Sequence, residues 1–464
     1  MKYWNDLVSS QRVDRIAGTL QRLCLLLVAA VELLFFLPGE RMDGIVYLFL
    51  EWKLVDISLL FFAASVCRKQ LRRSRWFFLA ALLTVIWFYV VRGIHLGLEQ
   101  TNKDPGTFVC AYLLCFPFAA AAGDADRQWG LKCLTAVFVL VGAVFGVYAV
   151  LLVTRHLPGF LEGYVFWDGS RFGTMGHPNI CATLLMVSIG LTTGYALQRK
   201  RLWQKYPLLL LSALEFWALC LTNSRAAILL TCALLGGIVF CALRKTGWKR
   251  LILAFAAAVA VLALLFGISR FIFSWNTKRL TAMAQQALQT GEATGLSLDE
   301  NGQLITENAQ GDSMASSMRT LNGRTEIWAA AAEGIRDYPR ILLFGTERVG
   351  QTISPHWRLE VQHSHNAWVE ALYQLGIPGL LAALAFTALA VWNGVVLLWR
   401  NDDLFRSCVT MVALCLMGCA VMEPYLFVVN IQFHYFDFLF LLSLGYMTLW
   451  RKRSTNGEGE RQNV

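Results

Sequence analysis

Two histidines stand immediately before a long apolar run in the stretch VQHSHNAWVEALYQLGIPGL, residues 361–380. They are His363 and His365, and Asn366 follows them at the start of an amphipathic helical pattern. Imidazole titrates near neutral pH and can take a proton from a hydroxyl group. We therefore interpret His365 as a candidate general base, with His363 as the weaker candidate. A structural histidine that caps the helix is the alternative.

A single arginine lies where an apolar helix is expected to begin. In the stretch LTNSRAAILL, Arg225 occupies the first turn of a predicted membrane helix. The helix dipole makes a cation unfavourable there by about 0.3–1 kcal/mol, and depth in a membrane adds to this cost. A bound anion would resolve the conflict, because free N–H groups, the Ser224 hydroxyl and the guanidinium would converge on it. Alternatively, Arg225 reaches the membrane surface or pairs with an acid such as Glu423.

Further polar groups gather in two other places on the same side of the expected membrane. The stretch RFGTMGHPNICATLL contributes Arg171, His177 and Asn179 at the entry to an apolar span. Arg324 stands with Trp328 on a predicted helix of the long polar loop. That loop holds more arginine than lysine, and arginine suits bidentate phosphate recognition. Solvated surface arginines are the simpler interpretation of each one taken alone.

The composition indicates a membrane protein rather than a soluble one. Of the 464 residues 56% are hydrophobic and 16% are charged, and the mean hydropathy is +0.51. The net charge of +10 does not indicate nucleic-acid binding, because lysine and arginine collect in short loops between apolar runs. The 12 cysteines lie in or beside apolar runs and form no metal-binding spacing, so we interpret them as small buried hydrophobes.

The pattern of apolar runs predicts an all-α polytopic membrane protein. About 20 apolar residues cross a bilayer, and the expected spans are 16–38, 45–66, 76–94, 107–122, 131–153, 178–197, 206–222, 224–243, 251–270, 376–399, 407–429 and 436–450. Basic segments such as RKQLRRSR at 68–75 all fall on one side if both termini are cytoplasmic. We retain the first apolar run as a span rather than a cleaved signal peptide.

This topology divides the chain into four parts. Residues 1–270 form nine spans, 271–375 a large extracytoplasmic loop, 376–450 three further spans, and 451–464 a basic cytoplasmic tail. Within the loop, the stretch 323–345 has helical spacing and predicts one helix, which ends before Pro339. A second is predicted over 366–375 with Asn366 as its cap. The Gly-rich and polar middle of the loop predicts a mobile segment, and we expect the two helices to cover the outer membrane surface.

Several common chemistries have no signature in this sequence. The outer side carries no D-x-D type acidic cluster, so we expect no metal–diphosphate site. There is no P-loop and no G-x-G-x-x-G, so we expect no nucleotide, and no G-x-S-x-G serine motif is present. We expect no cofactor.

The residues from about 170 to 450 resemble the superfamily of O-antigen ligases and O-antigen polymerases of the bacterial envelope. The motifs stand in the family's order: GHPNICATLL, TNSRAAILL, a large outer loop with GRTEIW, HSHNAWVEALYQLGIPGLL and a late EPYLF. The ligase motif H-[NSQ]-x9-G-x-x-T is matched by His365, Asn366 and Gly376, while Gly379 stands where the family has threonine. That departure leaves the choice between ligase and polymerase open.

The resemblance implies a GT-C-like, metal-independent glycosyltransferase on the outer face of the cytoplasmic membrane. It implies a donor glycan on undecaprenyl diphosphate, with Arg225 and Arg324 on the diphosphate and His365 as the base. The acceptor would be lipid A core, as in lipopolysaccharide synthesis, or a growing polymer, a wall glycan or a protein. The supporting residues would be Ser224, Asn366, Arg171, Asn179 and His363. A flippase for a lipid-linked saccharide is the competing class, although we find no internal repeat and few helix breaks.

Overall fold

The computed structural model describes most of the chain. The described residues are 11–36, 44–68, 75–103, 115–124, 128–168, 170–175, 177–244, 248–290, 298, 302, 323–346, 349–356, 361, 363–400, 403–427 and 434–455. The long helices are α2 (Gln11–Leu34), α3 (Gly44–Cys67), α4 (Arg75–Leu96), α7 (Trp129–Val153), α8 (Pro178–Gln198), α9 (Leu202–Leu221), α10 (Arg225–Leu243), α11 (Trp248–Thr290), α16 (Ala367–Arg400), α17 (Leu404–Ala420) and α18 (His434–Thr455).

Long apolar helices dominate the described part, and the expected fold class is confirmed: the protein is an all-α polytopic membrane protein. The segments that are long and apolar enough to cross a membrane are Val13–Leu34, Leu79–Leu96, Trp129–Val153, Pro178–Gln198, Arg225–Leu243, Trp248–Thr290 and Ala367–Arg400. The total of about twelve spans stays a prediction. Part of the fourth expected span, 107–122, lies outside the described residues.

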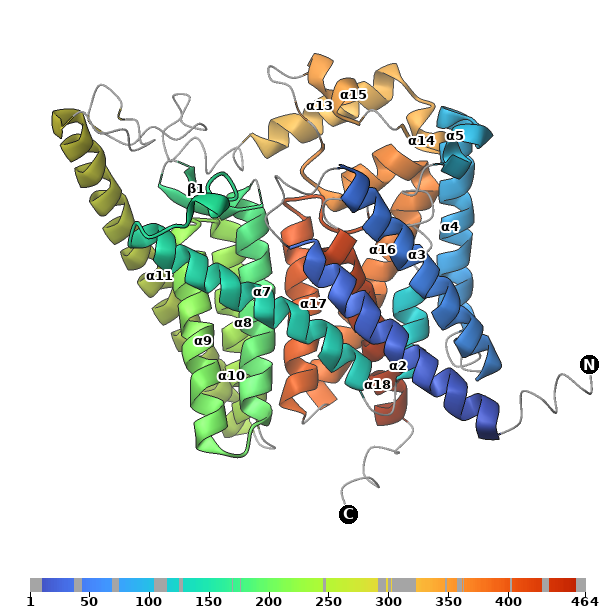
Figure 1. Cartoon of the computed structure of the whole chain (residues 1–464), viewed down its shortest axis with the longest axis horizontal. Coiled ribbons are helices and arrows are strands. Elements are labelled where there is room, and N and C mark those ends of the chain that lie inside the picture. Colours follow the sequence, from blue (N-terminus) through green and yellow to red (C-terminus); the bar gives the residue numbers. More distant parts are fainter. Residues whose placement is uncertain are drawn as a thin grey trace, which may run out of the picture.

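Helix α8 is mostly buried and packs against α7, α9, α10 and α17 (Figure 1). Small residues permit this close packing. A Cβ on Gly190 would lie 2.5 Å from Cγ2 of Val412 on α17, and one on Gly142 of α7 would meet the Ser188 side chain. Such contacts drive helix association in a membrane, where lipid removes the usual hydrophobic driving force. The buried core of α8 therefore holds its N-terminal end, with Asn179, at a fixed position.

Helix α11 runs from Trp248 to Thr290 without ending near residue 270, where hydropathy places the end of a span. At 1.5 Å per residue its 43 residues extend about 65 Å, roughly twice the hydrocarbon thickness. The polar part after residue 270 contains good helix formers and no proline, so nothing ends the helix where its apolar part ends. This polar part is anchored to the rest of the protein, because Asn276 Nδ2 donates to the Ser170 carbonyl at 3.2 Å.

The predicted helix in the long loop is confirmed as α13 (Arg324–Asp337), which ends before Pro339. Two short helices, α14 (Ile341–Phe344) and α15 (Val349–Ile353), and the 3-10 turn η4 (Ser354–His356) complete a cap at one end of the bundle (Figure 1). The buried face of α13 has the expected spacing and consists of Ile327, Ala330, Ala331 and Gly334. The Gly-rich middle of the loop lies almost wholly outside the described residues.

The predicted helix over 366–375 is confirmed as the first segment of α16. It meets the following apolar segment at Gly376, whose φ of 68° and ψ of −165° are not helical. Asn366 caps it as expected, since its Oδ1 accepts from the N–H groups of Trp368 and Val369 at 3.0 Å each. The loop after α14 packs on this bend, where the Thr346 N–H donates to the Tyr373 carbonyl at 2.6 Å.

A β-hairpin stands before α8 where only a loop is expected. Strands β1 (Val165–Asp168) and β2 (Arg171–Thr174) pair antiparallel, with Asp168 opposite Arg171. The sequence does carry a signal, because an Asp-Gly dipeptide between apolar stretches favours a tight hairpin. In Figure 1 the hairpin lies at the same end of the bundle as α13. The start of α2 and the end of α18 lie at the opposite end.

Candidate active site

The candidate site residues come from six separate segments near the cap end of the bundle. These are strand β2, the start of α8, the turn before α10, the start of α13, and the two loops that precede α16 and follow α17. Each segment is short and begins or ends at a well-packed helix. The helices thus act as a rigid frame that aims polar side chains into one region.

Glu423, in the loop after α17, is the residue on which these segments converge. Its Oε1 accepts from Arg324 Nη2 at 2.5 Å and from Asn179 Nδ2 at 3.0 Å, while its Oε2 lies 3.1 Å from His365 Nδ1. The carboxylate is only 10% exposed. Burial by itself opposes its ionisation, but the hydrogen bond from His365 and the charges of His365 and Arg324 lower the pKa of Glu423 to about 2. Glu423 is therefore an anion that orients a histidine and an arginine.

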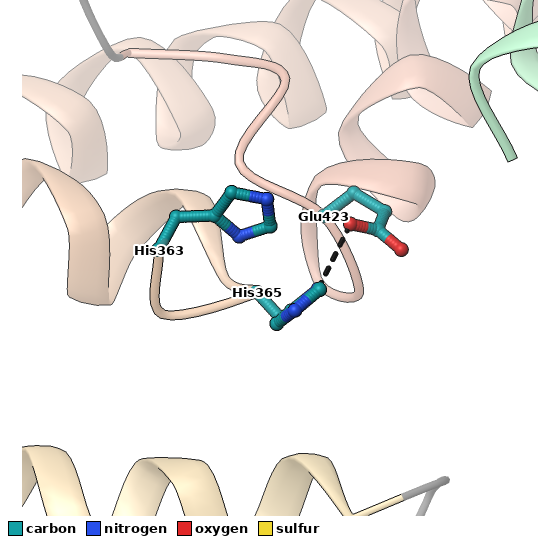
Figure 2. Close-up of side chains that lie close together, drawn as sticks. All are labelled: His363, His365 and Glu423. Atoms are coloured by element: carbon teal, nitrogen blue, oxygen red, sulfur yellow. Dashed lines mark hydrogen bonds and ion pairs between the residues drawn. The ribbon is translucent and has the colours of Figure 1, made fainter. Parts of the chain in front are cut away.

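The loop that carries His365 is fixed by its own hydrogen bonds. Ser364 donates from its N–H and from its hydroxyl to Glu370 Oε2, each at 2.7 Å. Asn366 donates from Nδ2 to the Val421 carbonyl at 3.1 Å, which ties this loop to the one that carries Glu423. His365 itself has a left-handed backbone with φ of 52°. A histidine in this conformation is uncommon, and it turns the imidazole toward Glu423 (Figure 2).

His363 lies beside His365, and the two rings meet edge to face with centroids 4.2 Å apart (Figure 2). Its Nδ1 is buried and has no hydrogen-bond partner in the described part of the chain. Desolvation, together with the nearby charges of His365, His177 and Arg324, lowers the pKa of His363 to about 4. His363 is thus a neutral ring at physiological pH, which packs against His365 and takes no part in its ion pair.

Arg171 and Asn179 connect the hairpin to the turn before α10 and to Glu423. Arg171 donates from Nε to the Thr222 carbonyl at 3.0 Å and from Nη2 to Asn179 Oδ1 at 2.7 Å. Asn179 then donates from Nδ2 to Glu423, so both ends of its amide are used. Desolvation lowers the pKa of Arg171, and the charges of Arg324 and Arg225 lower it further. The three arginines therefore share one positive region.

Arg225 is the first residue of α10 and is exposed. Within the described residues its side chain makes no hydrogen bond or ion pair. The suggested pairing of Arg225 with Glu423 is wrong, because both oxygens of Glu423 are bound by Arg324, Asn179 and His365. Ser224 is buried and its hydroxyl makes no capping hydrogen bond. The geometry thus leaves a cation at the positive end of a helix dipole with its guanidinium accessible.

The donor atoms of His363, His365 and Glu423 lie within 4.8 Å of one another, so these three side chains are the candidate metal ligands of the described part. Arg324 and Asn179 already occupy Oε1 of Glu423, and three arginines make the region positive. A divalent cation is disfavoured in such surroundings. We therefore interpret the cluster as an acid–base pair, and the absence of a required metal stays a prediction.

Sequence reasoning identified each of these polar stretches but missed the role of Glu423. It named His365, Arg324, Arg171 and Asn179 as separate candidates without a common partner. It considered Glu423 only as a partner for Arg225. The available signal was an acid followed by proline within the expected span 407–429, in the stretch MEPYLF. An ionisable residue at the end of a membrane helix is functional by default.

The fold and the site define a polytopic membrane protein with a cluster of charged and hydrogen-bonded side chains beneath a helical cap (Figure 1). Residues 208–384 match the family model described as O-antigen ligase, and over this part the chain is similar to that family. The matched region contains Arg225, Arg324 and His365, while Arg171 precedes it and Glu423 follows it. The comparison with curated proteins gives no match.

Proposed function

We propose that this protein transfers a glycan from undecaprenyl diphosphate to an acceptor hydroxyl, without a metal ion, at the outer face of the cytoplasmic membrane. The observation that carries the proposal is the placement of His365 and Arg324 on the two oxygens of the buried carboxylate of Glu423. A base and a cation held by one anion suit a reaction in which a hydroxyl loses a proton while a diphosphate leaves.

The hydrogen bond to Glu423 supports His365 as the base. Its Nδ1 faces a carboxylate, so the neutral imidazole carries its proton on Nδ1 and has a lone pair on Nε2. In the described part of the chain nothing bonds to Nε2, and the side chain is 29% exposed. The ionised Glu423 also stabilises the imidazolium that forms when Nε2 takes a proton.

The reaction proceeds by attack of the acceptor oxygen on the anomeric carbon of the donor sugar. The acceptor proton passes to Nε2 of His365, a new glycosidic C–O bond forms, and the bond between the anomeric carbon and the diphosphate oxygen breaks. The bonding electrons leave with undecaprenyl diphosphate. Negative charge therefore grows on the diphosphate oxygens in the transition state, and nearby cations stabilise it.

Arg225 is the cation best placed to bind that diphosphate. Its guanidinium is exposed, it has no partner among the described residues, and the first N–H groups of α10 lie beside it. Arg324 lies in the same positive region but is oriented by Glu423 and by the Met422 carbonyl, to which its Nε donates at 2.9 Å. We assign Arg225 to direct contact with the diphosphate. We place Arg324 between the diphosphate and His365, the proposed base.

The acceptor separates the two members of the superfamily. A ligase would accept a lipid A core sugar or another cell-envelope glycan, whereas a polymerase would accept a second lipid-linked glycan. Both use the same base, cations and leaving group. The polyprenyl tail of the donor lies among the membrane spans in this proposal, with both chain termini in the cytoplasm.

The test is consumption of a lipid-linked donor by purified protein in detergent. Undecaprenyl diphosphate-linked glycan is supplied with candidate acceptors in the presence of EDTA, and release of undecaprenyl diphosphate is followed. We expect turnover by the wild type, and loss of at least about 100-fold in His365→Ala and Arg225→Ala. His356→Gln is the matched control, since His356 lies near Glu333 and Asp337 on the cap and makes no interaction with Glu423 among the described residues.

Two results would contradict the proposal. Activity that disappears with EDTA and returns with a divalent cation would exclude a metal-independent reaction. If no acceptor leads to donor consumption, and the same protein in liposomes moves the lipid-linked glycan across the bilayer, the protein is a flippase instead.

A further inference from the structure

His177 joins the hairpin to α8 and serves as the N-cap of that helix. Its backbone is extended, with φ of −152°, and Pro178 follows at the first helical position. Its Nδ1 accepts a hydrogen bond from the Asn179 N–H at 3.1 Å. The lone pair of Nδ1 is therefore used, and a neutral ring must carry its proton on Nε2. The cap fixes the tautomer, so this histidine presents an N–H donor on its outer side.

The surroundings keep this ring neutral. Desolvation lowers the pKa of His177, the charges of Arg171 and His365 lower it further, and the opposing effects of Glu423 and Asp168 are smaller than the desolvation. Position at the positive end of the α8 dipole also disfavours an imidazolium. Protonation of Nδ1 would in addition break the cap. Near neutral pH His177 is a hydrogen-bond donor at Nε2 with no second acceptor site.

His177 lies in the same region as the proposed reaction centre. Its electrostatic neighbours are Glu423, Arg171 and His365, and the residue two positions later is the Asn179 that binds Glu423. The residue is partly exposed to solvent although its neighbours partly desolvate the ring, and nothing in the described part of the chain bonds to Nε2. The donor N–H is therefore available to a substrate that enters this region.

We propose that His177 donates a hydrogen bond from Nε2 to a phosphoryl oxygen of the lipid-linked donor. The inference rests on the proposed function, and it adds a binding residue that also stabilises the leaving diphosphate. A phosphoryl oxygen fits better than a sugar hydroxyl because the ring can only donate and stands beside Arg171 at the start of a 21-residue helix. An anion satisfies both the N–H and the positive surroundings.

Two substitutions separate this role from capping. His177→Asn and His177→Asp both preserve a good N-cap, so α8 remains capped in each. The asparagine still offers an N–H donor, whereas the aspartate offers none and places a negative charge beside the diphosphate. If His177 only capped the helix and lay away from the diphosphate, both substitutions would be tolerated equally.

The experiment measures kcat/KM with the donor and the acceptor varied separately, and inhibition by added undecaprenyl diphosphate. We expect His177→Asn to stay within about 3-fold of the wild type, and His177→Asp to lose about 100-fold in kcat/KM for the donor. Undecaprenyl diphosphate should inhibit the aspartate variant correspondingly less. Thermal unfolding of both variants checks that the cap is intact.

Equal activity of the two variants would overturn the inference, whether both are active or both inactive with intact folding. So would a loss confined to the KM of the acceptor. In those cases wild-type turnover still supports the proposed function, whereas absence of turnover by the wild type itself would remove that function first.

Discussion

Glu423 Oε2 lies 3.1 Å from Nδ1 of His365, although 58 positions separate the two residues in the chain. The contact joins the loop that precedes α16 to the loop that follows α17, and it determines which nitrogen of the ring remains free. The other oxygen of Glu423 holds Arg324. One buried carboxylate thus sets both the tautomer of the proposed base and the direction of a neighbouring guanidinium.

Glu423→Gln tests whether that charge matters to the reaction. The amide retains the size of the side chain but cannot stabilise an imidazolium or form an ion pair with Arg324. We expect kcat to fall by about 100-fold with a smaller change in the KM of the acceptor, because the loss arises when His365 becomes charged. The measurement is steady-state donor consumption. A Glu423→Gln variant with the kcat of the wild type would show that the charge of Glu423 has no role in the reaction and that its side chain only fills space.

The same carboxylate predicts how stability depends on pH. The pKa of Glu423 is about 2 in the folded protein, below its ordinary value of 4.5. Ionised Glu423 therefore stabilises the fold above about pH 4.5, and this contribution disappears as the pH falls from about 4.5 through about 2. At pH 7 the wild type should exceed Glu423→Gln in free energy of unfolding by on the order of 3 kcal/mol. Thermal unfolding in detergent between pH 3 and pH 7, roughly the window of acid unfolding, should show this difference shrinking at low pH. A constant difference would contradict the assignment.

Local patterns in the sequence predicted the helices well. Apolar runs indicated where α7, α8 and α10 lie, because their length and composition suffice without tertiary contacts. The cap at Asn366 was equally local. The apolar run indicated a membrane span over 251–270 but not the continuation of its helix to Thr290, because hydropathy reports where the apolar part ends and not where the helix ends.

The arrangement of the site depends on contacts that sequence cannot report. Glu423 binds residues 58, 99 and 244 positions away. No periodicity relates such positions, and only the packing of α8 and α17 brings Asn179 to Glu423. The individual chemistries of His365 and Arg324 could be inferred from residue type and motif. Their common partner could not.

Substitution of Gly376 tests whether the fold requires the bend that separates the first segment of α16 from its membrane segment. Its φ of 68° is strained for any other residue, and an added Cβ would lie 2.5 Å from the Leu343 carbonyl oxygen. We expect Gly376→Ala to lower the free energy of unfolding by at least about 2 kcal/mol. Thermal unfolding of the variant and the wild type measures this difference in stability.

Gly267→Ala in α11 is the matched control for this substitution. Gly267 is helical, and an added Cβ there would meet no atom within 4 Å. The alanine should leave stability unchanged or raise it by up to about 1 kcal/mol, through helix propensity. Equal effects at the two glycines would show that the bend at Gly376 is not required for the fold.

Arg225 gives the most direct test of the anion site. Its guanidinium is exposed at the first residue of α10, with no partner among the described residues. Arg225→Ala should lower kcat/KM for the lipid-linked donor by about 100-fold, and Arg225→Lys by about 10-fold, since lysine keeps the charge but loses bidentate geometry. Arg201→Ala, at an exposed arginine that precedes α9, is the control and should match the wild type. If Arg225→Lys were as inactive as Arg225→Ala, planar recognition rather than charge would dominate. If Arg225→Ala were as active as the control, the diphosphate would have to bind elsewhere, and the conflict between this arginine and the helix dipole would have a structural cause instead.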